Sequence, residues 1–226
     1  MTAGSVRVVG APTDYGANRR GVDMGPSAIR YAGLAAELER AGRAVVDDGD
    51  VRAPRAEERD PEAERPASGR AKFIRETREV ATRLADRVAG ALAADELPLV
   101  LGGDHSVAIG SVTGSARDAE IGAVWFDAHG DFNTPETSPS GNVHGMPLAA
   151  VLGVGEFADV EWANATGLDA SNVAIVGLRS VDESERSAIA DSDATTFTMS
   201  DIDERGIASV ADDALDGAAA GTDGVH

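Results

Sequence analysis

The residues with the clearest potential for chemistry form a short motif near the middle of the chain. Asp127, His129 and Asp131 alternate with small residues directly after the apolar run Gly122–Phe126. Because residues two apart share a face of an extended chain, the three side chains are expected to project together. Two carboxylates and an imidazole on one face suit a divalent metal ion. The alternative interpretation is a polar loop whose acidic residues cap the next helix.

A second motif supports the metal interpretation. His105 follows a Gly-Gly pair at the end of the apolar run Leu97–Leu101, with Asp104 beside it. A single histidine after a strand is more often a structural hydrogen-bonding residue. Two strand ends that each offer histidine and aspartate are better explained by a shared metal site. We therefore predict four metal ligands: His105, Asp127, His129 and Asp131.

A polar, proline-containing loop follows the first motif. It runs from Asn133 to Met146 and contains Ser140, Asn142 and His144. A loop at the carboxyl end of a strand is well placed to bind a substrate. His144 is a candidate proton carrier because histidine titrates near neutral pH. An ordinary surface loop is the alternative.

Two further carboxylates, Asp182 and Glu185, follow the apolar run Val173–Gly177. They share a face if this stretch forms one helical turn. They either bind a cationic group or lie at a helix N-terminus, where the helix dipole favours negative charge. The residues alone favour the second interpretation.

Apolar runs alternate with amphipathic stretches along the chain. The predicted strands are Val6–Ala11, Ala44–Val46, Leu97–Leu101, Gly122–Phe126, Val173–Gly177 and Thr195–Thr198. The predicted helices are Ser27–Ala41, Lys72–Ala94, Val107–Ala116, Glu183–Ala190 and Ser200–Ala219. This alternation is typical of a three-layer α/β/α fold with a mostly parallel sheet, whose ligand crevice lies at the carboxyl ends of the strands. Residues 1–226 are expected to form one domain, with 52–70 as a surface loop.

The composition is strongly acidic, with 39 Asp and Glu against 20 Lys and Arg and a net charge of -19. This charge argues against nucleic acid and anionic membranes as partners, and it is typical of a solvated surface, as in salt-adapted organisms. The absence of cysteine excludes thiolate metal sites. No secretory signal and no apolar run of about 20 residues is visible. We expect a cytoplasmic protein.

Together these motifs resemble those of the arginase/agmatinase (ureohydrolase) family. The resemblance spans nearly the whole chain, and the Asp-Ala-His-x-Asp pattern is highly specific. The loop at 133–145 resembles the arginases rather than the agmatinases. The motifs that carry the resemblance are Gly21-Val-Asp-Met-Gly-Pro26, Gly102-Gly-Asp-His-Ser106, Asp127-Ala-His-Gly-Asp131, Gly177-Leu-Arg179 and Met199-Ser-Asp-Ile-Asp203.

The resemblance implies two Mn²⁺ ions bridged by a hydroxide that attacks the guanidinium carbon of L-arginine, giving urea and ornithine. It implies that His105, Asp127 and Asp131 bind one ion, and that Asp127 and His129 bind the other. His144 would be the proton shuttle. The other implied substrate contacts are Asn133, Ser140 and Asn142 for the carboxylate, and Asp182 and Glu185 for the α-amino group. A homo-oligomer, trimeric or hexameric, is implied as well.

One part of the family pattern is not found in this sequence. The resemblance implies a further strand with the pattern Ser-x-Asp-x-Asp, whose aspartates complete the metal site, and the sequence ends at Gly224-Val-His226 where that strand is expected to begin. Without the corresponding strands we expect the sheet to be split, with two apolar edges exposed. Three hypotheses follow: a shortened arginase with little or no activity by itself, a ureohydrolase of agmatinase or formimidoylglutamase type, or a non-catalytic remnant or interaction subunit.

Overall fold

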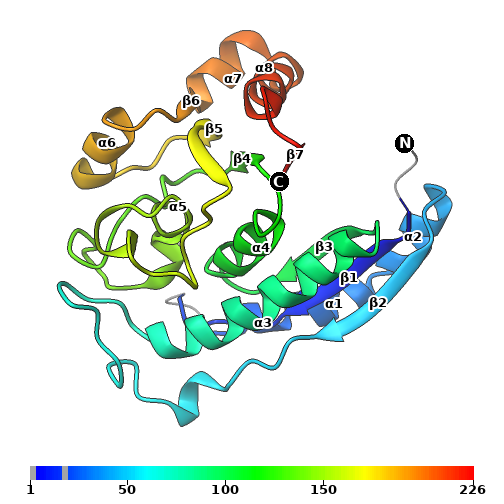
Figure 1. Cartoon of the computed structure of the whole chain (residues 1–226), viewed down its shortest axis with the longest axis horizontal. Coiled ribbons are helices and arrows are strands. Elements are labelled where there is room, and N and C mark those ends of the chain that lie inside the picture. The colour runs from blue at the N-terminus through cyan, green and yellow to red at the C-terminus, as the bar shows by residue number, and fades with distance from the viewer. Residues whose placement is uncertain (1–3, 17–19) are drawn as a thin grey trace.

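The computed structural model describes residues 4–16 and 20–226, and in this part of the chain all strands are parallel. They form two separate sheets, with strand orders β2-β1-β3 and β6-β5-β4-β7. Figure 1 shows the first sheet crossed by α3 and the second sheet on the other side of α4. The parallel α/β architecture is therefore confirmed, and the predicted division of the sheet is present.

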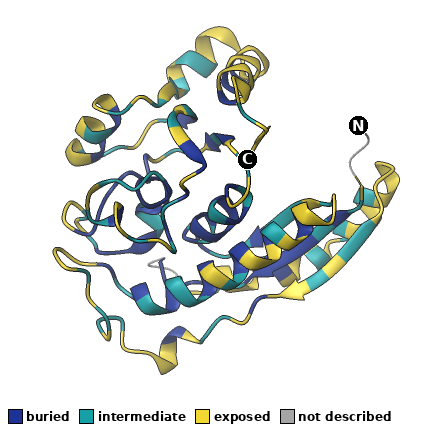
Figure 2. Cartoon of the chain, viewed as in Figure 1, coloured by how far each residue is buried: buried dark blue, intermediate teal, exposed yellow. Residues whose placement is uncertain are grey.

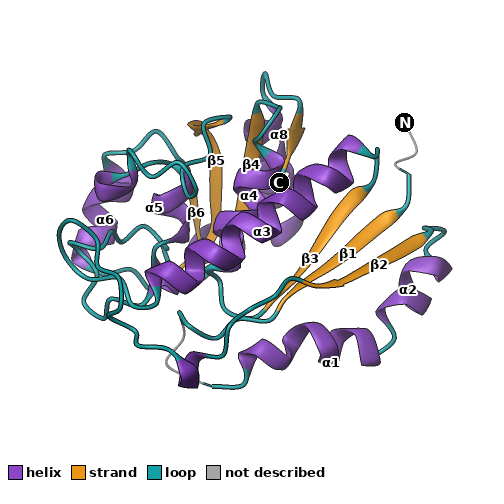
Figure 3. Cartoon of the chain, turned by 60° about the horizontal axis from the view of Figure 1, so that its bottom comes forward, coloured by secondary structure: helices purple, strands orange, loops and turns teal. Residues whose placement is uncertain are grey.

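The first sheet lies between two layers of helices. Its strands are β1 (Val6–Ala11), β2 (Val45–Asp50) and β3 (Leu97–Gly102). Helices α1 (Gly25–Tyr31) and α2 (Leu34–Arg40) cover one face, and α3 (Ile74–Ala93) covers the other (Figure 3). Val8 packs toward α2, whereas Val9 packs against Leu84 of α3. The continuous apolar run of β1 is explained by this burial on both faces.

The second sheet is also covered on both faces. Its strands are β4 (Ile121–Phe126), β5 (Leu168–Leu178), β6 (Thr195–Thr198) and the short β7 (Gly224–Val225). Its helices are α4 (Val107–Ser115), α5 (Pro147–Val151), α6 (Glu183–Ala190), α7 (Met199–Arg205) and α8 (Ile207–Ala219). Val210 of α8 packs against Val176, and Val112 of α4 packs in the core on the opposite face. Figure 2 shows buried residues concentrated on α4, α5 and β1.

Two predicted helices were wrong as single elements. The predicted helix Ser27–Ala41 is divided into α1 and α2 at Gly33, whose φ is 100°. The predicted helix Ser200–Ala219 is divided into α7 and α8 at Gly206, whose φ is 82°. Glycine adopts positive φ without the steric cost that other residues meet, so each glycine allows the chain to change direction. The predicted strand Ala44–Val46 extends further, to Asp50, along β1.

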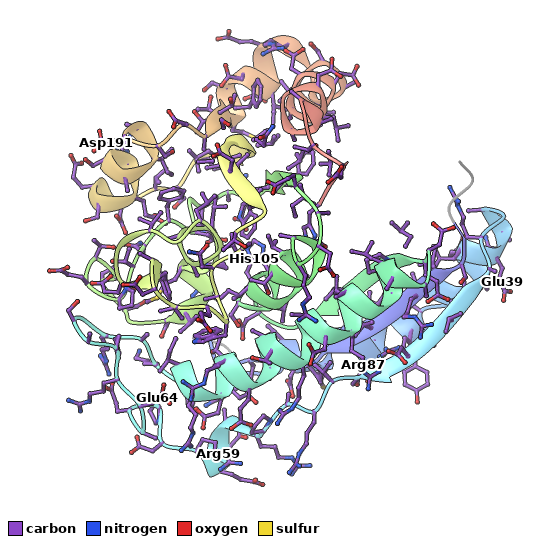
Figure 4. All side chains as sticks on the ribbon, in the orientation of Figure 1. Glu39, Arg59, Glu64, Arg87, His105 and Asp191 are labelled. Carbon is purple, nitrogen blue, oxygen red and sulfur yellow. The ribbon has the colours of Figure 1, made fainter. Side chains whose placement is uncertain are left out.

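The two sheets face each other across an apolar groove of about 660 Å³ lined by residues of β3, β4, α4 and β7. Leu97 of β3 and Phe126 of β4 are both exposed at this groove. The connection from β3 through α4 to β4 brings the carboxyl ends of the two strands together. Figure 4 shows His105 between the two halves of the molecule.

Residues 52–70 contain one short 3-10 helix, η2 (Ala56–Glu58), and otherwise no helix or strand. No helix in the described residues is long and apolar enough to cross a bilayer.

Candidate metal and substrate site

Three of the four predicted metal ligands converge at the carboxyl ends of β3 and β4. The Nδ1 atom of His105 lies 3.1 Å from Oδ2 of Asp127 and 2.6 Å from Oδ2 of Asp131. One ligand atom from each of the three side chains falls within 4.8 Å of the others. One imidazole nitrogen and two carboxylates at this spacing fit a Mn²⁺ ion by their chemistry.

The position of His105 is fixed by the loop that follows β3. A Cβ atom at Gly103 would lie 1.9 Å from the backbone oxygen of Thr13, so only glycine allows this close approach. The buried Asp104 accepts hydrogen bonds from the backbone N–H groups of Gly16 and Ser106, both at 3.0 Å. The aspartate of the Gly-Gly-Asp-His motif is therefore a structural residue that anchors the ligand-bearing loop.

Asp131 is held in an unusual backbone conformation. Its φ is 50°, a left-handed geometry that aspartate adopts more readily than most residues. The residue is 4% exposed, and the indole Nε1 of Trp125 donates to its Oδ2 at 3.3 Å. The Trp125 ring also lies against the His105 ring, with centroids 4.7 Å apart. Trp125 thus contacts two of the three converging side chains.

The expectation that Asp127, His129 and Asp131 share one face of an extended chain was wrong. The chain bends at residues 128–129 immediately after β4, so the alternation of an extended strand does not continue. The His129 side chain is 62% exposed, and its Nδ1 lies 3.2 Å from Oδ1 of Asp127. His129 therefore contacts Oδ1 of Asp127. The other oxygen of Asp127, Oδ2, lies near His105, which also contacts Asp131.

The electrostatics of the site follow from this packing. Burial by itself would lower the pKa of His105, but the carboxylates of Asp127 and Asp131 outweigh it and raise the pKa to about 9. Burial also opposes ionisation of Asp127, yet His105 and the backbone N–H of His129 hold the pKa of Asp127 well below its usual range. The carboxylate charge needed for binding a cation is thus maintained at neutral pH.

The predicted amino-group ligands form the start of α6. Asp182 is the N-cap residue, and it exchanges hydrogen bonds with Glu185 in a capping box. Both oxygens of Glu185 accept backbone N–H bonds, at 3.2 Å from Phe132 and 3.2 Å from Asp182. Burial raises the pKa of Glu185. The capping interpretation that the residues favoured is what the geometry shows, and Glu185 ties α6 to the loop that bears Asp131.

The loop that follows the metal motif is held by hydrogen bonds within the loop and to two distant residues, Asp182 and Lys72. Asn133 donates from Nδ2 to Oδ2 of Asp182 at 2.9 Å, and its Oδ1 accepts from Thr137 at 2.8 Å. Oγ of Ser140 accepts from the backbone N–H of Asn142 at 3.1 Å. The amide of Asn142 is nearly buried, and its Oδ1 accepts from Nζ of Lys72 at 3.0 Å. The predicted carboxylate-binding residues therefore lie in one constrained segment.

His144 lies in a short 3-10 helix, η3 (Val143–Gly145), and is half-buried. A Cβ atom at Gly16 would come within 2.7 Å of the backbone nitrogen of His144 and 2.7 Å of Oδ1 of Asp104. The segment after β1 therefore packs between His144 and the loop that carries His105. This places His144 beside the segment that anchors the ligand loop.

Three residues of the site were not singled out from the sequence. Trp125 could have been found, because it lies two residues before Asp127 at the end of the same strand. Asp104 was noted only as a possible partner of the metal site. Lys72 could not have been found, because it lies 70 residues from Asn142 in the chain.

The fold and the site together define an α/β protein with a histidine–carboxylate centre at the carboxyl ends of parallel strands. The Arginase family model matches residues 4–226. The chain is 45% identical over 224 residues to an arginase of Brevibacillus brevis, covering 98% of this chain and 73% of that protein. The chain belongs to the arginase family.

Solved structures agree with this assignment. The native arginase structure from Bacillus caldovelox matches with a TM-score of 0.86 at 39% identity, covering 99% of this chain and 74% of that one. A formimidoylglutamase from Bacillus subtilis matches with a TM-score of 0.73 at 20% identity, covering 98% of this chain and 63% of that one, which shows a shared fold alone.

Proposed function

We propose that this chain carries the metal-binding and substrate-binding residues of an enzyme that hydrolyses L-arginine to urea and L-ornithine. The observation that carries the proposal is the convergence of His105, Asp127 and Asp131 beside the constrained loop that contains Asn133 and Asn142. Arginase relatives at 45% and 44% identity support the reaction class.

The metal is proposed to be a pair of Mn²⁺ ions. His105, Asp127 and Asp131 fit one ion. His129 contacts Oδ1 of Asp127, so these two residues provide two ligands for a second ion. When bound, such a pair supplies hydroxide at neutral pH and neutralises charge that develops on the substrate. Because Asp127 contacts both histidines, it is the residue proposed to join the two ions.

The remaining residues are proposed to bind the substrate and to carry a proton. Asn133, Ser140 and Asn142 would donate hydrogen bonds to the α-carboxylate. Asp182 would bind the α-amino group, whereas Glu185 would act through Asp182 or through water, since both its oxygens already accept backbone N–H bonds. His144 would deliver a proton to the departing amine. From membership of the arginase family we also propose a cytoplasmic homo-oligomer, trimeric or hexameric.

A non-catalytic, metal-binding chain is the second candidate. Among residues 4–16 and 20–226, one group of three His, Asp or Glu side chains brings its ligand atoms within 4.8 Å of one another, and His129 does not belong to it. The family resemblance implies two further aspartates for a complete pair of ions, and this set does not include them. We therefore expect Mn²⁺ binding to be easier to detect than turnover.

The test uses the 226-residue chain with Mn²⁺ and measures urea release from L-arginine and from agmatine, together with the number of Mn²⁺ ions bound. The matched controls are the chain treated with chelator and the variant Asp131→Asn. Turnover of arginine would contradict the non-catalytic candidate, and turnover of agmatine alone would contradict the arginine assignment. A chain that binds no Mn²⁺ would refute the proposed metal site.

A further inference from the structure

Three buried side-chain oxygens outside the proposed metal and substrate site have no hydrogen-bond partner. Of the four such atoms among the described residues, three are Oγ1 of Thr13, Oε2 of Glu76 and Oγ1 of Thr77. The three residues are 2%, 1% and 3% exposed. Native proteins pair nearly all buried polar groups with protein, water or an ion. Each of these unpaired oxygens is therefore a candidate ligand atom.

The chain that leaves β1 brings one unpaired oxygen to the start of α3. Val9 shares a buried cluster with Leu84, and the ring of Tyr15 lies against that of Phe73, with centroids 5.7 Å apart. The chain from Val9 to Tyr15 therefore runs along α3 toward the N-terminus of that helix. Thr13, two residues before Tyr15, lies opposite the first turn of α3, which contains the other two unpaired oxygens.

The packing of α3 on α4 places the same helical turn beside the loop before α4. A Cβ atom at Gly110 would lie 2.6 Å from the backbone oxygen of Ala81, and one at Gly114 would lie 2.7 Å from the backbone oxygen of Ala85. The two helices are thus in close contact and run in the same direction. Thr77 lies one turn before the first of these contacts, at the level of the loop that precedes α4.

Thr13 contacts that loop directly. Its backbone oxygen accepts from the N–H of Asp104 at 3.0 Å, and a Cβ atom at Gly103 would lie 1.9 Å from the same oxygen. The three unpaired oxygens therefore lie where the end of β1, the first turn of α3 and the loop that carries His105 meet.

The charges around this place favour a cation. Arg75 donates to Oε1 of Glu76 at 2.6 Å, which leaves Oε2 as the carboxylate oxygen without a partner. Burial and then four nearby carboxylates, Glu76 first among them, raise the pKa of Tyr15, so negative charge predominates here. A water molecule would offer hydrogen bonds but no positive charge. Carboxylate and hydroxyl oxygens are ligands of hard cations, and one carboxylate with two neutral oxygens balances a single positive charge.

We propose that Thr13, Glu76 and Thr77 bind one monovalent cation, Na⁺ or K⁺, which joins the start of α3 to the loop that carries His105. The two hydroxyl oxygens are neutral ligands, and Glu76 supplies the opposite charge. The ion offsets the cost of a buried carboxylate oxygen without a partner. This inference does not depend on the arginine reaction proposed above.

The first test measures thermal unfolding of the 226-residue chain in equal concentrations of KCl, NaCl and choline chloride. Choline is too large for the site but screens the acidic chain equally. We expect the midpoint of unfolding to be about 3 °C higher in KCl or NaCl than in choline chloride. The salt that gives the larger rise identifies the preferred ion. Equal midpoints in all three salts would overturn the proposal.

Variants of α3 locate the effect. Glu76→Gln should abolish the difference between the salts, and Thr77→Val, which removes a hydroxyl at nearly constant shape, should reduce it. The control is Glu79→Gln on the same helix, which removes the same charge from a partly exposed residue paired with Arg83 and should retain the difference. A difference that persists unchanged in Glu76→Gln would exclude this site.

A second measurement needs no variant and therefore holds even if Glu76→Gln does not fold. Rb⁺ resembles K⁺ in charge and size and scatters X-rays anomalously. Crystals of the wild-type chain grown in RbCl should show an anomalous peak among the three oxygens of Thr13, Glu76 and Thr77. Density at this position without an anomalous signal would be a water molecule, and it would overturn the proposed cation, as would the absence of any peak.

Discussion

The side-chain amide of Asn133 donates to the carboxylate of Asp182 at 2.9 Å and thereby joins the loop after β4 to the start of α6. Asp182 also accepts from the backbone N–H of Glu185 at 2.9 Å as the N-cap of that helix. One carboxylate therefore connects the metal-bearing loop with a neighbouring helix, in addition to any role toward a substrate.

Replacing Asp182 should show how much its hydrogen bonds to Asn133 and to the start of α6 contribute to stability. Asp182→Ala removes the cap and the bond to Asn133, and we expect it to lower the free energy of unfolding by about 1–3 kcal/mol. Asp182→Asn keeps a good N-cap but places an NH₂ group toward the amide of Asn133, so the loss should be smaller. Urea denaturation measures both values. An Asp182→Ala variant as stable as wild type would show that this junction contributes nothing.

Binding of Mn²⁺ should stabilise the chain through the three converging ligands. We expect the midpoint of thermal unfolding to rise with Mn²⁺ concentration, because the ion binds the folded state alone. Asp131→Asn should reduce this rise sharply. Asparagine tolerates the positive φ of residue 131, so the variant removes charge without adding backbone strain.

The control for this experiment is Asp193→Asn, an exposed aspartate in the loop after α6. It changes the net charge by the same amount and should leave the Mn²⁺ effect intact. Differential scanning calorimetry across a Mn²⁺ series provides the comparison. Equal rises for Asp131→Asn and wild type would exclude Asp131 as a ligand.

The convergence of His105 with Asp127 and Asp131 could be predicted from the sequence because it follows from one rule. A strand–helix–strand connection brings the carboxyl ends of its two strands to the same side, so polar residues after β3 and β4 meet there although the two strands lie in separate sheets. The place of His129 could not be predicted. It depends on the bend after β4, where the backbone N–H groups of the distant residues Arg179 and Ser180 donate to the oxygen of Ala128 at 2.9 and 2.8 Å.

The ends of the helices could likewise be predicted only in part. Gly33 and Gly206 were visible in the sequence, but a single glycine is tolerated inside a helix at a cost of about 1 kcal/mol, so it predicts a break only weakly. The packing of α2 against the first sheet and of α8 against the second decides that both glycines end a helix. Pairing between distant segments, such as that of Lys72 with Asn142, leaves no local pattern.

The buried carboxyl group of Glu185 should make stability depend on pH. Burial raises the pKa of Glu185 above its value of 4.5 in an unfolded chain. Its contribution to stability is therefore fully present below pH 4.5 and is lost as pH rises through the folded-state pKa. At neutral pH, wild type carries a buried charge that Glu185→Gln does not.

Glu185→Gln should consequently gain stability relative to wild type as pH rises. Glutamine also loses one of the two acceptors used by Phe132 and Asp182, which adds a cost of about 1–3 kcal/mol at every pH. The informative quantity is therefore how the difference in free energy of unfolding between Glu185→Gln and wild type changes with pH. Urea denaturation of both proteins from pH 5 to pH 8 measures it. A difference that is constant over this range would contradict the raised pKa.

The groove between the two sheets should make the chain self-associate and bind apolar dyes. Leu97 is 50% exposed on β3 at this groove, beside the unpaired edge of that strand. Exposed apolar patches next to an open strand edge are sites of aggregation, and an inward-pointing charge on the edge strand opposes it. Leu97→Glu should therefore reduce both dye fluorescence and the apparent mass in light scattering.

Ile207→Glu is the matched control, since Ile207 is 52% exposed at the start of α8 and does not line the groove. Both variants add one negative charge to an already acidic chain, so a general effect of charge repulsion would appear equally in both. A larger effect of Leu97→Glu assigns the association to the groove. A specific apolar surface responds to the position of an added charge as well as to its sign. Equal effects of the two variants would therefore mean that net charge controls association and that the exposed edge of β3 is not the surface through which the chains associate.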